Sequence, residues 1–335
     1  MTTTVILVRH GRSHYNEIGR FQGSSDESHL TLEGFETAQL TGQFLQQFAI
    51  DHTFVSPLQR AQRTMTAMRS ANPTIPTATS LDKLREIDLP EWQGRFYRDV
   101  RANLPEAYKQ WKMTPDRFTM RTEDIPSATA FFPVIELFDR AQALWQQLIP
   151  PSDDQTLLIV SHGGTIQALI ATALGLPSTV FHRIQQCNCG VSVLQFNHGL
   201  EAPAQLQHLN DTRHLNQALP KLKEGKRGLR HLLLVGNDVR SAPQVHALEQ
   251  LAAHSARPGV MTGIRTQSPQ QVRQQIQTAW GINSDSSTLN ADRLHLASGA
   301  VCVLHQPESL NYTIVQSIWP ASLALSKPAP TIAAH

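Results

Sequence analysis

The chain has 335 residues, of which 40% are hydrophobic and 17% are charged, and its formal net charge at pH 7 is +2. This is the composition of an ordinary globular protein, with enough residues for one large domain or two smaller ones. There is no long basic block and no apolar run near the ~18 residues needed to cross a bilayer, so nothing indicates a nucleic-acid or membrane partner.

The three cysteines are too few for a disulfide framework, so a reduced, cytoplasmic setting is expected. No signal peptide is expected, because Arg9 and His10 interrupt the early apolar run. Cys187 and Cys189 supply two thiolates without further ligands, which falls short of a closed zinc site. We therefore expect no metal and no other cofactor.

The first half of the chain begins with a predicted strand over Val5–Val8, a continuous apolar run typical of a strand that is buried on both faces. A helix is predicted over Thr31–Phe48. Phe54-Val55 indicates the end of a second strand. Ser56-Pro57 then begins a predicted helix over Gln59–Arg69, because proline favours the first helical turn.

Further along, the apolar spacing predicts an amphipathic helix over Val134–Leu148 and a second buried strand over Leu157–Val160. A helix over Thr165–Leu174 and a strand over Val191–Phe196 follow. Strands that alternate with helices predict an α/β fold: a mostly parallel sheet with helices on both faces.

The chain changes character after residue 211. We predict a first domain over residues 1–211, a polar and basic linker over 212–228, a smaller α/β unit over 229–319 and a Pro/Ala-rich tail over 320–335.

Two histidines follow the two buried strands directly. His10 comes after Val5–Val8 and His162 after Leu157–Val160, and each precedes a glycine that allows a tight turn. Because ligands of open α/β sheets bind beyond the carboxyl ends of the strands, both side chains are expected at one site.

Two arginines occupy matching places in the sequence. Arg9 is adjacent to His10, and Arg60 lies in the first turn of the predicted helix after Ser56-Pro57. Two guanidinium groups beside two imidazoles form a cationic pocket whose natural ligand is a phosphoryl group, because the planar guanidinium matches phosphate oxygens.

Such a pocket permits nucleophilic catalysis without a metal. A neutral imidazole of His10 attacks phosphorus, and the attack is easiest if a backbone carbonyl holds the other ring nitrogen. An alkoxide leaving group needs a general acid, for which Glu86 is the best candidate; Asp88 and Glu91 are nearby alternatives. Arg140, on the predicted amphipathic helix, is expected to form salt bridges instead.

Four stretches, "LVRHGRSHYN", "SPLQRAQRT", "LREIDLPEWQG" and "VSHGGTI", occur in this order. Together they resemble the histidine phosphatase (phosphoglycerate mutase-like) superfamily over residues 1 to about 210. The resemblance implies a three-layer αβα fold and a phosphohistidine intermediate. It implies catalytic roles for His10, Glu86 and His162, and phosphate-binding roles for Arg9, Arg60 and Asn16. The family's frequent "GGES" loop is replaced by "SATAFFPVIELFDR", so the resemblance says least about the substrate.

The resemblance is greatest to metal-independent phosphoserine phosphatases, so L-phosphoserine, in serine biosynthesis, is the first expected substrate. Sugar phosphates, including carboxypentitol phosphates, are alternatives, as is a phosphoglycerate mutase activity. A phosphate-binding module without activity is the non-enzyme alternative. The expected partner is a small phosphorylated metabolite, and a homodimer is the assembly that we consider.

The sequence of the second unit resembles that of the first. "HLLLVGNDVRS" resembles "TVILVRHGRS", and "QSPQQVRQQI" resembles "VSPLQRAQRT". In this alignment Gly236 and Asn237 replace Arg9 and His10, Val272 replaces Arg60, and "SHGG" has no counterpart. We therefore predict a degenerate, catalytically inactive repeat.

Overall fold

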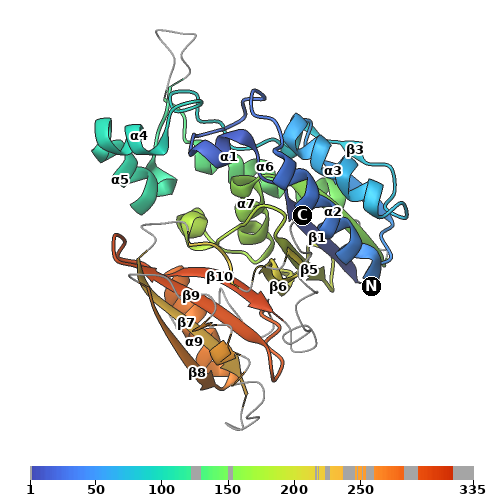
Figure 1. The fold of residues 1–335 in the computed structure, drawn as a ribbon, viewed down its shortest axis with the longest axis vertical. Helices are drawn as coiled ribbons and strands as arrows, with labels where there is room; N and C mark the ends of the chain where they lie inside the picture. The colour runs from blue at the N-terminus through green and yellow to red at the C-terminus, as the bar shows by residue number, and fades with distance from the viewer. Residues whose placement is uncertain are drawn as a thin grey trace, which may run out of the picture. The chain divides into compact units, whose positions relative to one another are not determined.

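The computed structural model describes residues 2–121, 130–149, 154–215, 217, 219–222, 227–236, 246, 248–250, 252–253, 260–282 and 293–319. The chain forms two compact units (Figure 1). The first unit comprises Met1–His182 and Asn188–Ala204, and the second comprises Arg183–Cys187 and Gln205–His335. Each unit is described by itself.

The sheet of the first unit has the strand order β3-β2-β4-β1-β5. Three of its pairings are parallel, namely β1 with β4, β4 with β2 and β2 with β3, whereas β5 is antiparallel to β1. The bounds of the strands are Thr3–Arg9 for β1, His52–Val55 for β2, Thr79–Ser80 for β3, Gln155–Ser161 for β4 and Val191–Phe196 for β5.

The strand order places helices on both faces of this sheet. From β1 to β2 and from β2 to β3 the chain moves toward one edge, and from β3 to β4 it moves back. Because such crossovers are right-handed, the helices of the two directions lie on opposite faces. The helix α2 packs on α3, and α6 packs on α7. Their bounds are Leu32–Phe44, Gln59–Ala71, Pro133–Leu148 and Gly163–Ala173.

Burial explains why the central strands are apolar throughout. Val5–Val8 and the matching residues of β4 are covered by helices on both faces, and each is at most 1% exposed. The helix α2 begins at Thr31, whose hydroxyl accepts a hydrogen bond from the backbone N–H of Gly34 at 3.1 Å. The two strand ends that carry His10 and His162 are thus held by a close-packed core.

The first unit also contains short helices, and we call those between β3 and β4 the insert (Figure 1). The α-helices are α1 (His14–Ile18), α4 (Tyr97–Asn103) and α5 (Pro105–Met113). The 3₁₀ turns along the chain are Leu45–Gln47, Asp82–Leu84, Pro115–Arg117, Ser178–Arg183 and Arg213–Leu215.

The second unit has a sheet of order β6-β10-β9-β7-β8, in which only β7 and β8 are parallel among the pairs of the described residues. The helix α9 (Pro269–Trp280) follows β8 and contacts β7, β8 and β10. The strands are β6 (Gln205–Asp211), β7 (Gly228–Val235), β8 (Val260–Gln267), β9 (Val301–Pro307) and β10 (Ile314–Trp319).

The structure confirms the predicted fold class, a mostly parallel α/β/α architecture with a smaller α/β unit after it. The predicted strands and helices of the first unit all form, with ends that differ by a few residues. The predicted tail over residues 320–335 and part of the predicted linker over 212–228 lie outside the described residues. Within the described part, none of the helices has the length and hydrophobicity needed to cross a membrane.

Candidate active site

His10 lies directly after β1 and is 1% exposed. Its backbone N–H donates to Ser161 O at 2.8 Å, which ties it to the end of β4. Its ring Nδ1 lies 2.7 Å from Gly11 O, and because a carbonyl oxygen only accepts, Nδ1 carries the proton. The lone pair of the neutral ring is therefore on Nε2, the tautomer that nucleophilic attack by Nε2 requires.

Gly11 is required by close packing next to the nucleophile candidate. A Cβ atom at this position would overlap the backbone carbonyl of Gly34, at the start of α2. The N–H of Gly11 donates to Thr64 Oγ1 at 2.9 Å, so α3 also holds this loop. The glycine that follows His10 thus allows a helix and the strand-end loop to touch.

His162 lies beside His10, with ring centroids 5.1 Å apart, and is fully buried. Its Nε2 shares a hydrogen bond of 2.7 Å with Ser56 Oγ, whereas its buried Nδ1 has no hydrogen-bond partner in the part of the chain that the structure describes. Burial first, and then the positive charge of Arg60, hold the pKa of His162 well below 6.5. The ring is therefore neutral at pH 7.

Arg60 projects from the first turn of α3 and is fully buried. Its Nη1 donates to Ser25 O at 2.6 Å and its Nη2 donates to Gly23 O at 2.9 Å, so it also holds the loop that precedes α2. Burial lowers its pKa to about 10, which leaves the guanidinium charged at pH 7. Its buried Nε has no hydrogen-bond partner among the described residues.

Arg9 completes the cationic cluster. A Cβ atom placed on Gly163 would lie 3.2 Å from Arg9 Nε, so the arginine passes over the start of α7. The charge of Arg9 also lowers the pKa of His162, by less than the charge of Arg60 does. The structure therefore gathers the two predicted arginines and the two predicted histidines at one end of the sheet.

Glu86 lies at the N-terminus of α7. Its Oε2 accepts from the N–H of Gly164 at 3.1 Å, and its Oε1 accepts from the N–H groups of Thr165 and Ile87, both at 3.0 Å. Its charge acts on Arg60. A Cβ on Gly164 would come within 2.7 Å of Oε1, so the second glycine of "SHGG" makes room for this carboxyl group.

The two alternative carboxylates lie elsewhere. Asp88 is exposed and accepts from the hydroxyl of Ser24. Glu91 accepts from the N–H of Arg121 at 2.7 Å. The geometry therefore favours Glu86 over both as the carboxyl group of the cluster.

Arg140, for which salt bridges were expected, binds backbone carbonyls. Its Nη2 donates to the carbonyls of Arg85 and Glu86, at 2.8 and 3.0 Å, and these bonds hold the segment that carries Glu86. A charged residue on a helix face that is otherwise mostly buried was the available sequence signal for this role.

Asn16 lies on α1, and its Oδ1 is engaged within the loop. It accepts from the N–H and the hydroxyl of Ser13, at 3.3 and 3.1 Å, and from Asn188 Nδ2 at 3.0 Å. The sequence gives no direct signal for Asn188, which stands out only by its place between Cys187 and Cys189.

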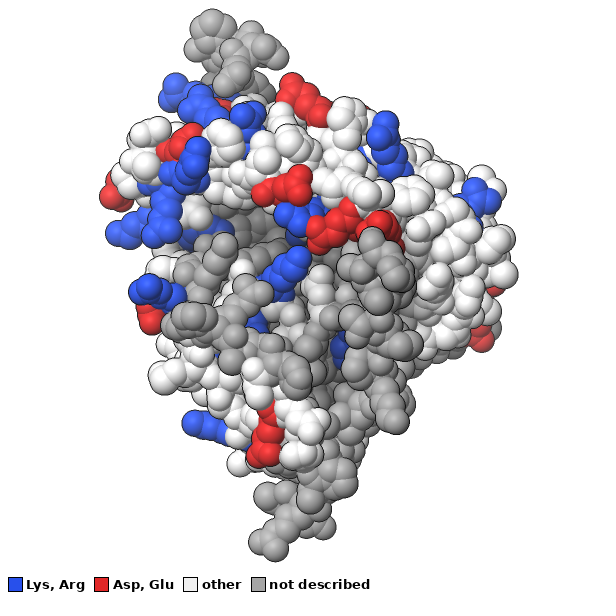
Figure 2. Space-filling view, in the orientation of Figure 1, with Lys and Arg blue, Asp and Glu red and all other residues white. Residues whose placement is uncertain are grey.

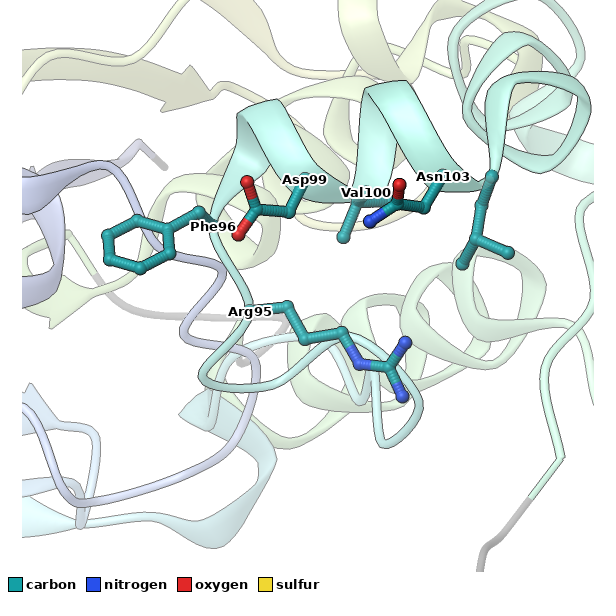
Figure 3. Close-up of a pocket in the computed structure, with 6 residues that line it drawn as sticks. Arg95, Phe96, Asp99, Val100 and Asn103 are labelled. Carbon is teal, nitrogen blue, oxygen red and sulfur yellow. The ribbon is translucent and has the colours of Figure 1, made fainter.

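In the described ranges, no three His, Cys, Asp or Glu side chains group as metal ligands. A cavity of about 170 Å³ lies in the insert (Figure 3). Figure 3 shows the Arg95 and Asn103 side chains extending along it. It is lined by Arg95, Phe96, Asp99, Val100, Asn103 and Leu104.

The insert is also basic. In the view of Figure 2, blue side chains gather over the part that Figure 1 labels α4 and α5. These helices carry Arg98, Arg101, Lys109 and Lys112, against Asp99 and Glu106. A positive surface raises the local concentration of small anions.

The family model described as "Histidine phosphatase superfamily (branch 1)" matches residues 5–212. A 2-carboxy-D-arabinitol-1-phosphatase from Triticum aestivum is 37% identical over 194 residues, which are 57% of this chain and 37% of that protein. The chain thus spans well under half the length of this relative.

Two further proteins are similar over nearly their whole length. Phosphoserine phosphatase 1 from Hydrogenobacter thermophilus is 27% identical over 213 residues, or 64% of this chain and 94% of that protein. The crystal structure of a phosphoserine phosphatase from Entamoeba histolytica, in complex with 3-phosphoglyceric acid, matches with a TM-score of 0.53 and 25% identity. It covers 64% of this chain and 99% of that one.

Proposed function

Because the chain belongs to the histidine phosphatase superfamily, we propose that it hydrolyses phosphate monoesters through a phosphohistidine on His10. The observation that carries the proposal is the tautomer of His10. Gly11 O holds Nδ1–H and leaves the lone pair on Nε2, within a cluster of two arginines and a neutral His162. This is the state in which an imidazole acts as a nucleophile.

In the first step, Nε2 of His10 forms a bond to phosphorus while the bond from phosphorus to the ester oxygen breaks. Glu86, which must be protonated at the start of this step, gives its proton to the leaving oxygen. Arg9 and Arg60 neutralise the charge on the equatorial phosphoryl oxygens. His162, as a neutral imidazole, presents a ring nitrogen to the same oxygens. In the second step, water attacks phosphorus, Glu86 takes its proton, and the N–P bond breaks to release inorganic phosphate.

For the substrate, we propose a small phosphate monoester that carries a carboxylate. L-Phosphoserine remains the first candidate. A carboxypentitol phosphate is the second candidate. It is supported by the 37% identity to the wheat 2-carboxy-D-arabinitol-1-phosphatase, which is higher than the 27% identity to the bacterial phosphoserine phosphatase. Both candidates carry a phosphate and a carboxylate, and the basic helices of the insert favour such anions.

The test measures kcat/KM with EDTA present, since specificity is a ratio of these constants. Substrates are L-phosphoserine, 2-carboxyarabinitol 1-phosphate and 3-phosphoglycerate, with ribose 5-phosphate as the matched substrate without a carboxylate. We expect phosphate release that is unchanged by EDTA and a higher kcat/KM for the carboxylated substrates. We also expect an acid-labile phosphoenzyme. Loss of activity in EDTA, or equal kcat/KM for ribose 5-phosphate, contradicts the proposal. Isomerisation of 3-phosphoglycerate without phosphate release assigns a mutase instead.

A further inference from the structure

The turn before β5 touches the strand end that carries His10. We infer that Asn188, in this turn, is a positioning residue that selects the reactive tautomer of His10. The inference rests on the proposed function for its catalytic consequence. Its structural basis is independent of any substrate.

Asn188 and the next residue hold three consecutive carbonyls of the nucleophile segment. The N–H of Cys189 donates to Arg9 O at 2.9 Å. Asn188 Nδ2 lies 2.9 Å from His10 O and 3.2 Å from Gly11 O. Because backbone carbonyls only accept hydrogen bonds, the amide nitrogen of Asn188, and not its oxygen, must face them.

The contact with Gly11 O has a chemical consequence. This oxygen is the acceptor of the His10 Nδ1–H bond, at 2.7 Å. If the Gly11 carbonyl turned away, this hydrogen bond would no longer hold the proton on Nδ1, and an exchange of the proton to Nε2 would remove the nucleophilic lone pair. Asn188 therefore acts on His10 through the carbonyl that selects its tautomer.

The same amide nitrogen also faces α1, so its two N–H groups are shared among three acceptors. Asn188 Nδ2 lies 3.0 Å from Asn16 Oδ1, which also accepts from Ser13 N and Ser13 Oγ. The first helix after the nucleophile and the turn before β5 thus meet at one amide group. A small displacement of this group would shift both flanks of the His10 loop.

The second unit indicates that the asparagine is not needed to form such a turn. There, the N–H of Gly299 donates to Val235 O at 2.7 Å, as the N–H of Cys189 donates to Arg9 O. Cys189 and Gly299 both have positive φ, 56° and 87°. The residue that matches Asn188 is then Ser298, and the turn forms with it. Where the histidine is missing, the asparagine is missing as well.

The test compares Asn188→Ser, which copies the residue of the second unit and keeps the turn, with Asn188→Ala. Asn72→Ala is the matched control, because Asn72 is a buried asparagine of the first unit whose Oδ1 accepts from the N–H and hydroxyl of Thr74. Long-range ¹H–¹⁵N NMR of the full chain reports the tautomer of His10, whose signal is identified by its loss in His10→Gln. Single-turnover kinetics reports the rate of phosphoenzyme formation.

We expect both Asn188 variants to show a mixture of His10 tautomers. Phosphoenzyme formation falls by about 10²-fold with KM nearly unchanged, because small misplacements of a reacting group cost rates of this order. Asn72→Ala leaves both readouts unchanged. A wild-type tautomer in both Asn188 variants overturns the inference, whatever their stability. If the wild-type protein forms no phosphoenzyme, the proposed function fails, but the NMR comparison still decides the role of Asn188.

Discussion

Two strand pairs of this chain have the same backbone pattern and different chemistry. At the end of β1, the N–H of Arg9 donates to Gly190 O, and at the end of β7 the N–H of Val235 donates to Ala300 O. Val235 therefore matches Arg9, and Gly236 matches His10. The comparison indicates that the apolar residues and the turn are enough to form this strand end. Arg9 and His10 are needed for the site and not for the fold.

This match moves the predicted alignment of the two units by one residue. The sequence pairing set Gly236 against Arg9 and Asn237 against His10, and Asn237 lies outside the described residues. The backbone hydrogen bonds set Gly236 against His10 instead. The degenerate repeat stays a prediction, and these matches support it.

The helices that follow the strands differ in a similar way. Ser56 precedes α3 and bonds to the ring of His162, whereas Ser268 precedes α9 and accepts from the N–H of Gln271 as an ordinary helix cap. At the matching place in the first turn, Arg60 and Val272 are both fully buried. One unit buries a guanidinium that can bind a phosphate, and the other buries an aliphatic side chain.

The two sheets differ in what lies between the matching strands. In the first unit β4 lies between β1 and β2, and it delivers His162 at its end. In the second unit β7 pairs directly with β8 over eight residues. The lack of an "SHGG" counterpart stays a prediction, and this direct pairing supports it.

The second unit also contains a reciprocal pair of contacts. The N–H of Gln185 donates to Val315 O, and the N–H of His295 donates to Leu206 O, both at 3.0 Å. The strands β6 and β10 run antiparallel, with Leu209 opposite Ile318.

The largest expected effect comes from His10→Ala. Without the imidazole no phosphohistidine forms, and we expect kcat to fall by at least about 10³-fold. Quench-flow detection of the acid-labile phosphoenzyme checks this. Gly236→Ala, the matching change in the second unit, is the control and should leave turnover unchanged; residual phosphoenzyme in His10→Ala would break the comparison.

Glu86→Gln has the second largest expected effect. The amide keeps the shape of the side chain but supplies no proton, so we expect kcat to fall by about 10²-fold for alkyl phosphates. Phosphorylation by p-nitrophenyl phosphate, whose leaving group needs little protonation, should change much less. The ratio of the two single-turnover rates measures this, with Glu91→Gln as the control. Equal losses on both substrates would argue against proton donation.

Arg60→Val places the residue of the second unit in the first. It removes a charge that can bind phosphate and the two bonds to Ser25 O and Gly23 O. We expect kcat/KM to fall by about 10²-fold, since hydrogen bonds to charged groups are worth about 1.5–3 kcal/mol each. Val272→Ala is the control, which should lower the thermal midpoint without changing kcat/KM. An active Arg60→Val enzyme would remove this arginine from the site.

The smallest expected effect is on how the stability of the protein depends on pH. His162 stays neutral in the folded state because its pKa is lowered, whereas in the unfolded chain it takes up a proton below about pH 6.5. The unfolded state then binds more protons, so stability falls as pH falls, by at most about 1.4 kcal/mol per pH unit from this group.

Urea unfolding at pH 7 and pH 5 measures this dependence. His162→Gln should lose less stability than the wild type between the two values. His208 has a pKa lowered to about 4 by burial, and it contributes equally to both proteins, so the difference isolates His162. An unchanged difference between pH 7 and pH 5 in His162→Gln would contradict the neutral, buried ring.

The sequence by itself determined the fold class, the strands that end at His10 and His162, and the residues of the cationic cluster. These features follow from local patterns: continuous apolar runs, glycine after a strand end, and proline at a helix start. Backbone geometry and burial act over a few residues, so they leave a readable signal.

Only the tertiary structure decided how the side chains are held. Asn188 is far from His10 in sequence, and Arg140 is far from Glu86, yet each donates to carbonyls beside these residues. Hydrogen bonds between distant segments depend on which strands and helices become neighbours. The register of Val235 and Gly236 was decided in the same way, because a one-residue shift changes little in an apolar sequence but changes every backbone partner.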